Sequence, residues 1–199
     1  MAFNKESQGF TFLFSIIMVV VVATVLAVAA LGLKGPQEEN MKQEKMQNVL
    51  GSIQVESSRE EASAKFGEFI KKRVILDSEG NVLSETEGDV KTLSVDGKEA
   101  YESDAFNIDI KKQYRDKSLT DQQKRFPLFI CEKDGNPYYV VPLVGTGLWG
   151  PIWGFIALEA DMNTIFGATF DHKTETPGLG AEINQSWFEE PFVGDKIFD

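Results

Sequence analysis

The sequence is poor in the residues that build cysteine and histidine sites. Among 199 residues there is one cysteine, Cys131, and one histidine, His172. An intramolecular disulfide, a zinc site of several cysteines and histidines, and a thiolate-bound iron–sulfur cluster are therefore excluded within this chain. Any redox chemistry must use an organic cofactor. Cys131 follows three apolar residues, which favours a buried small side chain over a reactive thiol.

Positive charge is also scarce. The formal net charge is -11, and because residues 1–34 hold two lysines and one glutamate, the remainder carries -12. Such an acidic part argues against binding nucleic acid or anionic lipid surfaces. Dinucleotide-binding and Walker A loops are absent too, so we predict no NADH site. No Ser-His-Asp or paired-carboxylate spacing supports a catalytic residue.

Charge is absent altogether from residues 7–33. The apolar stretch 10–33 exceeds the roughly 20 residues that a helix needs to cross a bilayer core. The alternative is a cleaved signal peptide, since Ala27-Val28-Ala29 fits an A-x-A site, but signal peptides have apolar regions of only about 7 to 15 residues. We therefore predict a retained anchor. Lys5 and Lys34 give a weak bias toward a cytoplasmic N-terminus.

The length leaves room for one folded domain beside the anchor. Gly35-Pro36 is predicted to break the first helix, and residues 37–50 are rich in helix-forming Glu, Lys, Gln and Met. The predicted organisation is a tail at 1–9, a transmembrane helix at 10–33, a stalk or linker helix at 34–57 and the folded domain at 58–199.

A second helix is predicted to start at Ser58. Glu61 stands three residues later, as a capping box requires. Phe66, Phe69 and Ile70 recur at helical spacing and indicate one apolar face. Packing against a core explains this helix completely.

Beyond residue 72 the pattern becomes typical of β-strands. Short apolar or alternating runs are separated by polar, glycine-bearing turns of hairpin type. The runs are 74–76, 82–83, 129–131, 138–141, 155–158 and 165–170, and the turns are 77–81, Asp96-Gly97 and 134–137. The sequence therefore predicts an α+β fold, built on antiparallel strands with flanking helices.

Glycine and tryptophan become dense in residues 145–154, which contain Trp149 and Trp153. Glycines let the backbone approach another surface closely, and tryptophans offer flat apolar walls. Two interpretations stay open for this segment. It is either a ligand wall or a tight sheet crossing filled by tryptophan.

Residues 172–182 form a second informative segment. Pro177-Gly178 has the residue types of a type II turn, and Gly180 relieves a second crowded point. Such a loop can direct backbone N–H groups at a flavin, whose ring needs an apolar slot and donors near its polar edge. His172 is more typical of a hydrogen-bonded structural residue than of a catalytic acid. Glu175 fits a loop carboxylate that accepts backbone N–H groups.

These segments resemble the C subunit of the sodium-translocating NADH:quinone reductases, a family of flavin-binding domains. The resemblance covers nearly the whole chain, and its most specific part is the Glu-Thr-Pro-Gly-Leu-Gly run at 175–180. The other matching segments are the N-terminal span, 30–34 with 37–40, 126–129, 147–151 and 171–173. The equivalent subunit of the ferredoxin-linked sister complex is the alternative within the same class.

The resemblance implies a periplasmic domain, held in the bacterial inner membrane by one helix. It also implies FMN, attached through its phosphate to a threonine by a flavin transferase. The subunit would relay electrons between other subunits toward quinone, without catalytic activity of its own. The positions that match the flavin-facing segments of the family are Trp149, Glu175, Thr176, Gly178, Leu179 and Gly180.

The sequence departs from the family at the attachment threonine. In the family this residue lies in a Ser-Gly-Ala-Thr motif several tens of residues beyond the Pro-Gly loop. Thr169 is a poor substitute, because it precedes His172 and Phe166 stands where the motif has serine. We expect a C-terminally truncated domain whose residues 196–199 begin a strand. A membrane-tethered assembly or binding module without cofactor is the alternative from another class.

Overall fold

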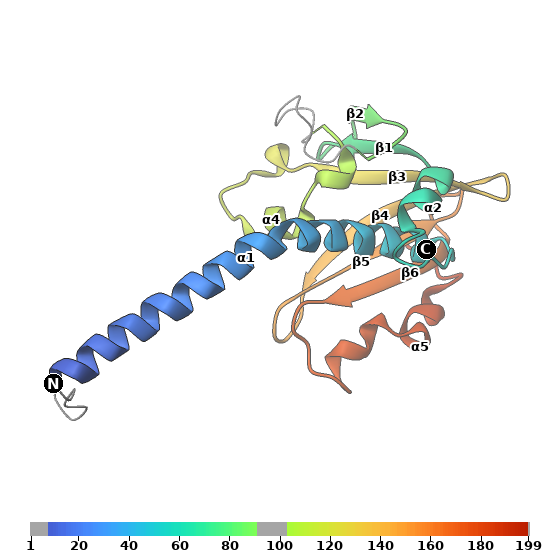
Figure 1. Cartoon of the computed structure of the whole chain (residues 1–199). Helices are drawn as coiled ribbons and strands as arrows, with labels where there is room; N and C mark the ends of the chain where they lie inside the picture. Colours follow the sequence, from blue (N-terminus) through green and yellow to red (C-terminus); the bar gives the residue numbers. More distant parts are fainter. Residues whose placement is uncertain (1–7, 91–102, 199) are drawn as a thin grey trace. The chain divides into compact units, whose positions relative to one another are not determined.

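The computed structural model of the chain describes residues 8–90 and 103–198 (Figure 1). The expected turn at Asp96-Gly97 and most of the expected tail at 1–9 lie outside the described residues. Residue contacts divide the chain into two compact units, Met1–Lys42 and Gln43–Asp199. The boundaries expected for the anchor, the stalk and the domain stay predictions.

The first helix, α1 (Gln8–Ser52), is continuous and contains Pro36. The prediction that Gly35-Pro36 breaks this helix is wrong. A proline inside a helix removes one N–H donor but leaves the hydrogen bonds on either side, and strong helix formers follow it here. Of the helices in the described ranges, α1 is the one long and apolar enough to span a membrane.

Six antiparallel strands form one sheet, in the order β2-β1-β3-β4-β5-β6. The predicted apolar runs all lie on these strands, so the α+β prediction is confirmed. The strands are β1 (Ile70–Leu76), β2 (Val82–Thr86), β3 (Phe126–Lys133), β4 (Asn136–Thr146), β5 (Pro151–Leu158) and β6 (Ile165–His172).

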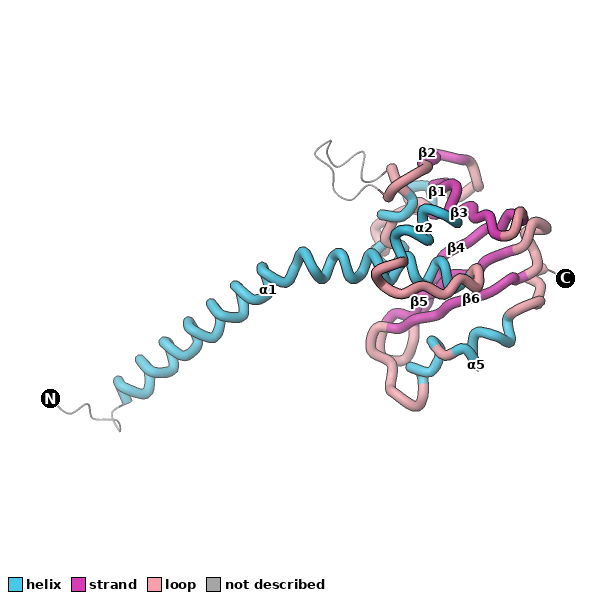
Figure 2. Tube along the Cα trace, turned by 45° about the vertical axis from the view of Figure 1, so that its right-hand side comes forward, coloured by secondary structure: helices cyan, strands magenta, loops and turns pink. Residues whose placement is uncertain are grey.

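Short helices complete the domain. The α-helices are α2 (Ala62–Phe69), α4 (Ile110–Arg115) and α5 (Ser186–Glu189), and the 3-10 helices are η1 (Ala105–Asn107), η2 (Asp121–Gln123), η3 (Gly180–Asn184) and η4 (Glu190–Phe192). Figure 2 shows α5 beside the β6 edge of the sheet.

The two hydrogen bonds of the capping box predicted at Ser58 are present, but the predicted helix start is wrong, because α2 begins at Ala62 with Glu61 at its N-cap. The N–H of Ser58 donates to the Glu61 carboxylate at 3.4 Å, and the N–H of Glu61 donates to the Ser58 hydroxyl at 3.3 Å. The assignment of Ile70 to this helix is wrong, because Ile70 is the first residue of β1. Its side chain is buried in either case, so helical spacing alone could not place the boundary.

The turn between β3 and β4 follows the prediction. Asp134 and Gly135 both have positive φ, 53° and 77°, as the two central residues of a type I′ turn require. This turn matches the twist of the two strands and sets the β3–β4 register. The β3–β4 hairpin therefore follows from local sequence.

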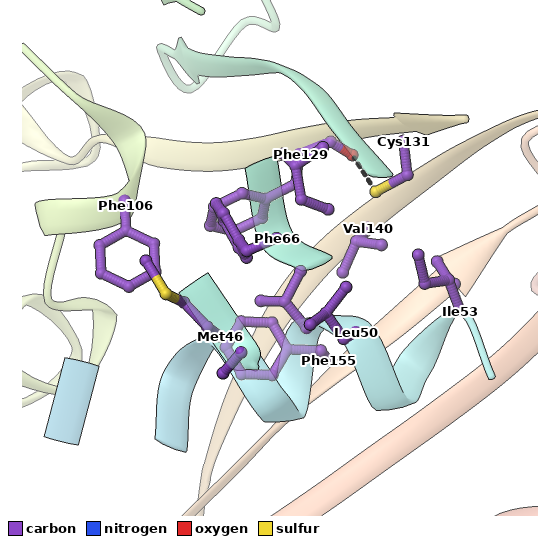
Figure 3. Close-up of a cluster of buried hydrophobic side chains, with 13 residues drawn as sticks. Met46, Leu50, Ile53, Phe66, Phe106, Phe129, Cys131, Val140 and Phe155 are labelled. Carbon is purple, nitrogen blue, oxygen red and sulfur yellow. Dashed lines mark hydrogen bonds between the residues drawn. The ribbon is translucent and has the colours of Figure 1, made fainter. Parts of the chain in front are cut away.

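The core lies where the end of α1 and helix α2 pack on the sheet (Figure 3). Met46 and Leu50 of α1 meet Phe66 of α2 and strand residues such as Phe129. Cys131 is buried beside them, and burial raises the pKa of its thiol to about 12. It is a core residue, as the sequence predicts.

The last residues pair with the chain just before β6. Thr164 and Lys196 form an isolated antiparallel bridge, and the N–H of Ile197 donates to the Asn163 carbonyl at 3.0 Å. The strand-like character expected near residue 196 is therefore present as one bridge.

Candidate functional site

The glycine- and tryptophan-rich segment is a hairpin loop between β4 and β5. Thr146 pairs with Pro151 at the strand ends, and the N–H of Gly147 donates to the Gly150 carbonyl at 2.8 Å. This loop leaves Leu148 83% and Trp149 66% exposed. The tip of this hairpin loop therefore presents two neighbouring apolar side chains to its surroundings.

The second tryptophan has a different environment. Trp153 lies on β5, and the Lys111 ammonium of α4 lies 3.6 Å from the centre of its ring. This contact is a cation–π interaction within the domain. Of the two tryptophans, Trp149 is the one that the structure leaves available for a ligand.

The loop after β6 contains the predicted type II turn. Gly178 has a φ of +75°, and the N–H of Leu179 donates to the Thr176 carbonyl at 3.1 Å, closing the turn. The turn projects Leu179, which is 73% exposed. Beside Gly178, an added Cβ would meet no atom within 4 Å. The turn therefore has open space next to its glycine.

Glu175 brings the two loops together. Its Oε1 accepts a hydrogen bond from the backbone N–H of Trp149 at 2.9 Å, across 26 positions of sequence. Only 8% of Glu175 is exposed. A Cβ on Gly147 would overlap Oε1, and a Cβ on Gly180 would lie 2.9 Å from Oε2. Both glycines make room for this one carboxylate.

Two further bonds hold the same region. The Thr174 hydroxyl donates to the Trp149 carbonyl at 2.8 Å, and the N–H of Glu175 donates to Nδ1 of His172 at 3.3 Å. His172 is thus hydrogen-bonded within the loop, as predicted. Glu175 accepts a backbone N–H, which is the role that its sequence context favours.

The N–H groups of the turn differ from the expectation. The N–H of Gly178 donates to Oε1 of Glu182 at 2.8 Å, and the N–H groups of Leu179 and Ala181 donate to the Thr176 carbonyl. These donors are used inside the loop rather than directed outward. A ligand could reach the Gly178 N–H only by displacing the Glu182 side chain.

Carboxyl groups also accumulate where the end of α1 meets β6. Burial and the neighbouring Asp171 carboxylate raise the pKa of Glu44. Thr169, two positions before Asp171, donates its hydroxyl to the Asn48 carbonyl of α1 at 2.8 Å. Thr169 thus faces α1, and the absence of FMN from this residue stays a prediction. No metal-binding group of three or more His, Cys, Asp or Glu side chains occurs in residues 8–90 and 103–198.

Comparison with known proteins assigns this region. Residues 147–198 match the family of FMN-binding domains, and this range contains both loops. The chain is 38% identical to the crystal structure of the C subunit of the Na(+)-translocating NADH-quinone reductase from Parabacteroides distasonis, with a TM-score of 0.66 over 83% of this chain and 71% of that one. The chain belongs to the family of these C subunits.

Other members agree. Shewanella oneidensis NqrC superposes with a TM-score of 0.56 at 25% identity, over 80% of this chain and 72% of that one. The C subunit from Vibrio parahaemolyticus is 27% identical over 100% of this chain and 77% of its own length. The C subunit from Neisseria meningitidis is 29% identical over 99% and 75%. The resemblance inferred from sequence is confirmed.

The predicted site residues gather in the two loops. Trp149 lies in the hairpin loop, and Gly180 begins η3. The loop after β6 holds the other four predicted residues, Glu175, Thr176, Gly178 and Leu179. Their contact with a flavin stays a prediction. Sequence reasoning missed Thr174 and Glu182, which tie these loops to the backbone. Gly147 and Gly180 were the available signal for the buried carboxylate between them.

Proposed function

We propose that this chain is the FMN-carrying electron-transfer subunit of a membrane-bound sodium-translocating NADH:quinone oxidoreductase. One observation carries the proposal. The segment that matches the FMN-binding family contains the hairpin loop and the turn that Glu175 joins, and each of them exposes a large apolar side chain. In this function the chain relays electrons between other subunits toward quinone.

The two loops fit a flavin ring. An isoalloxazine system needs apolar walls along its faces and a few polar groups near its edge. Trp149 and Leu179 offer the walls, the Thr176 hydroxyl lies in the same loop, and the space beside Gly178 is open. When bound, FMN supplies one- and two-electron redox chemistry. The residues of this chain bind and orient it.

The anchor and its orientation complete the proposal. Residues 10–33 hold the chain in the bacterial inner membrane, and the domain lies on the periplasmic side. The apolar stretch at residues 10–33 is longer than the apolar region of a signal peptide, which supports retention of this helix over its removal. Recovery of the full chain in the soluble fraction after cell breakage would contradict the anchor.

The partners follow from this function. The domain receives electrons from another subunit, because the sequence contains no dinucleotide-binding loop, and the chain alone should not oxidise NADH. Flavin attachment in this family implies a flavin transferase as a maturation partner. We expect no FMN on Thr169, because its hydroxyl already donates to α1.

The test is co-expression of the chain with the other subunits of the complex and a flavin transferase. We expect the purified complex to hold FMN in this subunit and to reduce it rapidly after NADH is added. Reduction by ferredoxin but not by NADH would support the sister complex. A complex in which this subunit holds no flavin would support an assembly or binding module.

A further inference from the structure

We propose that Glu175 is a positioning residue that fixes the hairpin loop relative to the turn after β6. Its carboxylate sets the separation of Trp149 from Leu179, the two side chains proposed to wall the flavin. We call this contact between Glu175 and the two loops the clamp; it is a property of the chain without FMN. Its consequence for FMN rests on the proposed function.

The first argument is the place of the carboxylate between two backbones. Oε1 binds the Trp149 N–H, while Oε2 lies against the Cα side of Gly180. A side chain at Gly147 or Gly180 would occupy the position of the carboxylate. Both glycines therefore keep one buried acid in contact with both loops.

The second argument is how Trp149 is held. Its N–H donates to Glu175 and its carbonyl accepts from Thr174, whereas 66% of the residue is exposed. The backbone of Trp149 is thus bound on both sides by the loop after β6. The indole is left to meet something outside the chain, so the bonds position it without covering it.

The third argument is the chemistry of the acceptor. In the described ranges no lysine, arginine or histidine nitrogen lies within 4.0 Å of the Glu175 carboxylate to form an ion pair. A buried carboxylate needs donors, and its bond to a backbone N–H is stronger than a bond between neutral groups. Removing the carboxylate would leave the Trp149 N–H without its acceptor.

Glu182 offers a matched control. It is also a glutamate of the same loop, and its Oε1 accepts from the N–H of Gly178 at 2.8 Å. That bond spans four positions and stays within the loop. Loss of Glu182 should therefore loosen the turn without releasing the hairpin.

The first measurement is amide hydrogen exchange of the full chain in detergent micelles without flavin. We expect Glu175→Ala to accelerate exchange at the Trp149 amide about tenfold, since a lost hydrogen bond to a charged acceptor makes local opening easier. Glu175→Gln keeps an acceptor oxygen and should show a smaller change. Glu182→Ala should leave Trp149 at the wild-type rate. Equal exchange at Trp149 in wild type and Glu175→Ala would overturn the proposal.

A second variant covers the case in which Glu175→Ala does not fold. Gly147→Ala places a methyl group where Oε1 lies, so it should displace the carboxylate and also accelerate exchange at Trp149. Gly67→Ala is its control, because the added methyl meets nothing within 4 Å there. Wild-type exchange at Trp149 in Gly147→Ala would contradict the clamp.

The second measurement is a titration of the same full-length variants with free FMN, followed by flavin fluorescence. We expect Glu175→Ala to weaken binding about tenfold and Gly67→Ala to leave it unchanged, because only the former moves a wall of the slot. Equal FMN affinity in wild type and Glu175→Ala would overturn the positioning role. If the wild type binds no FMN while the exchange result holds, the proposed function is weakened and the clamp stands.

Discussion

Asp104 and Glu175 are both buried acids that lie toward opposite ends of the sheet, and their hydrogen-bond partners differ. Beside β1, Asp104 receives two bonds of 2.9 Å from the Arg73 guanidinium, whose side chain is 1% exposed. Beside β5 and β6, Glu175 receives the Trp149 N–H and no cation in the part of the chain that the structure describes. One carboxylate is paired with a buried cation, and the other accepts a backbone N–H.

The surroundings differ in the same sense. Arg73 also donates to the carbonyls of Gly88 and Asp89, and Asp104 accepts from Phe106 N–H, so the pair joins several segments inside the fold. The two loops that Glu175 joins instead expose the apolar side chains of Leu148, Trp149 and Leu179. The buried ion pair beside β1 therefore stabilises the interior of the fold, whereas the single bond from Glu175 holds two exposed loops beside β5 and β6.

Removal of Asp104 should have the largest effect. Asp104→Ala leaves the Arg73 guanidinium buried without its counter-charge, which typically costs about 3 to 5 kcal/mol of stability. The measurement is the free energy of unfolding of the full chain in detergent by chemical denaturation. Lys72→Ala breaks an exposed pair with Glu85 and serves as the control with a much smaller effect. Equal losses in the free energy of unfolding for the two variants would show that the Arg73–Asp104 pair contributes no more than an exposed ion pair.

Lys45 is a buried cation that binds backbone carbonyls instead of a carboxylate, so its titration gives a second test of the comparison. Its ammonium donates to the carbonyls of Phe106 and Ile108. Burial lowers its pKa to about 8, against the opposing effect of the Asp109 carboxylate. Because the unfolded chain holds this proton up to a pH of about 10.4, stability should rise as the pH increases from about 8 to 10.

The total contribution is of order 3 kcal/mol, because each unit of pKa difference corresponds to about 1.4 kcal/mol. Lys45→Met should remove this pH dependence, so that its advantage over the wild type shrinks with rising pH. Denaturant melts of both proteins at pH 7 to 10 provide the measurement. A constant difference between them would mean that Lys45 titrates normally.

Gly178→Val should affect function more than stability. A β-branched residue resists a φ of +75°, which costs about 1 to 3 kcal/mol. Gly80→Val is a matched control, because Gly80 has a φ of +85° and also has open space beside it. We expect similar thermal destabilisation in both variants, but weaker FMN binding in Gly178→Val alone. Unchanged FMN binding would place the flavin elsewhere.

Glu182→Ala should have the smallest effect. It removes one partly exposed hydrogen bond to Gly178, so we expect a loss of stability below about 1 kcal/mol. Thermal melts and exchange at the Gly178 amide measure it. Faster exchange at the Trp149 amide in Glu182→Ala would show that the Glu182 bond also holds the hairpin loop.

Most of the fold could be predicted from the sequence. Apolar alternation and glycine-bearing turns located the strands, since both signals depend on residues a few positions apart. The errors came where local signals conflict with context. At Pro36 the helix loses one N–H donor, but the hydrogen bonds on either side keep it continuous. At Ile70 an apolar residue at helical spacing belongs to strand β1 instead of helix α2.

The candidate site was predicted in part. The Pro-Gly turn followed from its residue types, whereas the sequence left the tryptophan segment open between a ligand wall and a tight sheet crossing. The bond between Glu175 and Trp149 could not be predicted, because nothing local links two residues 26 positions apart. The same holds for Arg73 and Asp104, which are 31 positions apart.

The sequence by itself determined the apolar span at residues 10–33, the strand-and-turn pattern and the Pro-Gly turn, because each depends on short-range sterics or on composition. Only the tertiary structure decided which side chains meet. The antiparallel register pairs Thr146 with Pro151 and Ile152 with His172, and so brings the ends of β4, β5 and β6 together. Glu175 reaches the hairpin loop because long-range strand pairing, rather than local preference, sets that distance.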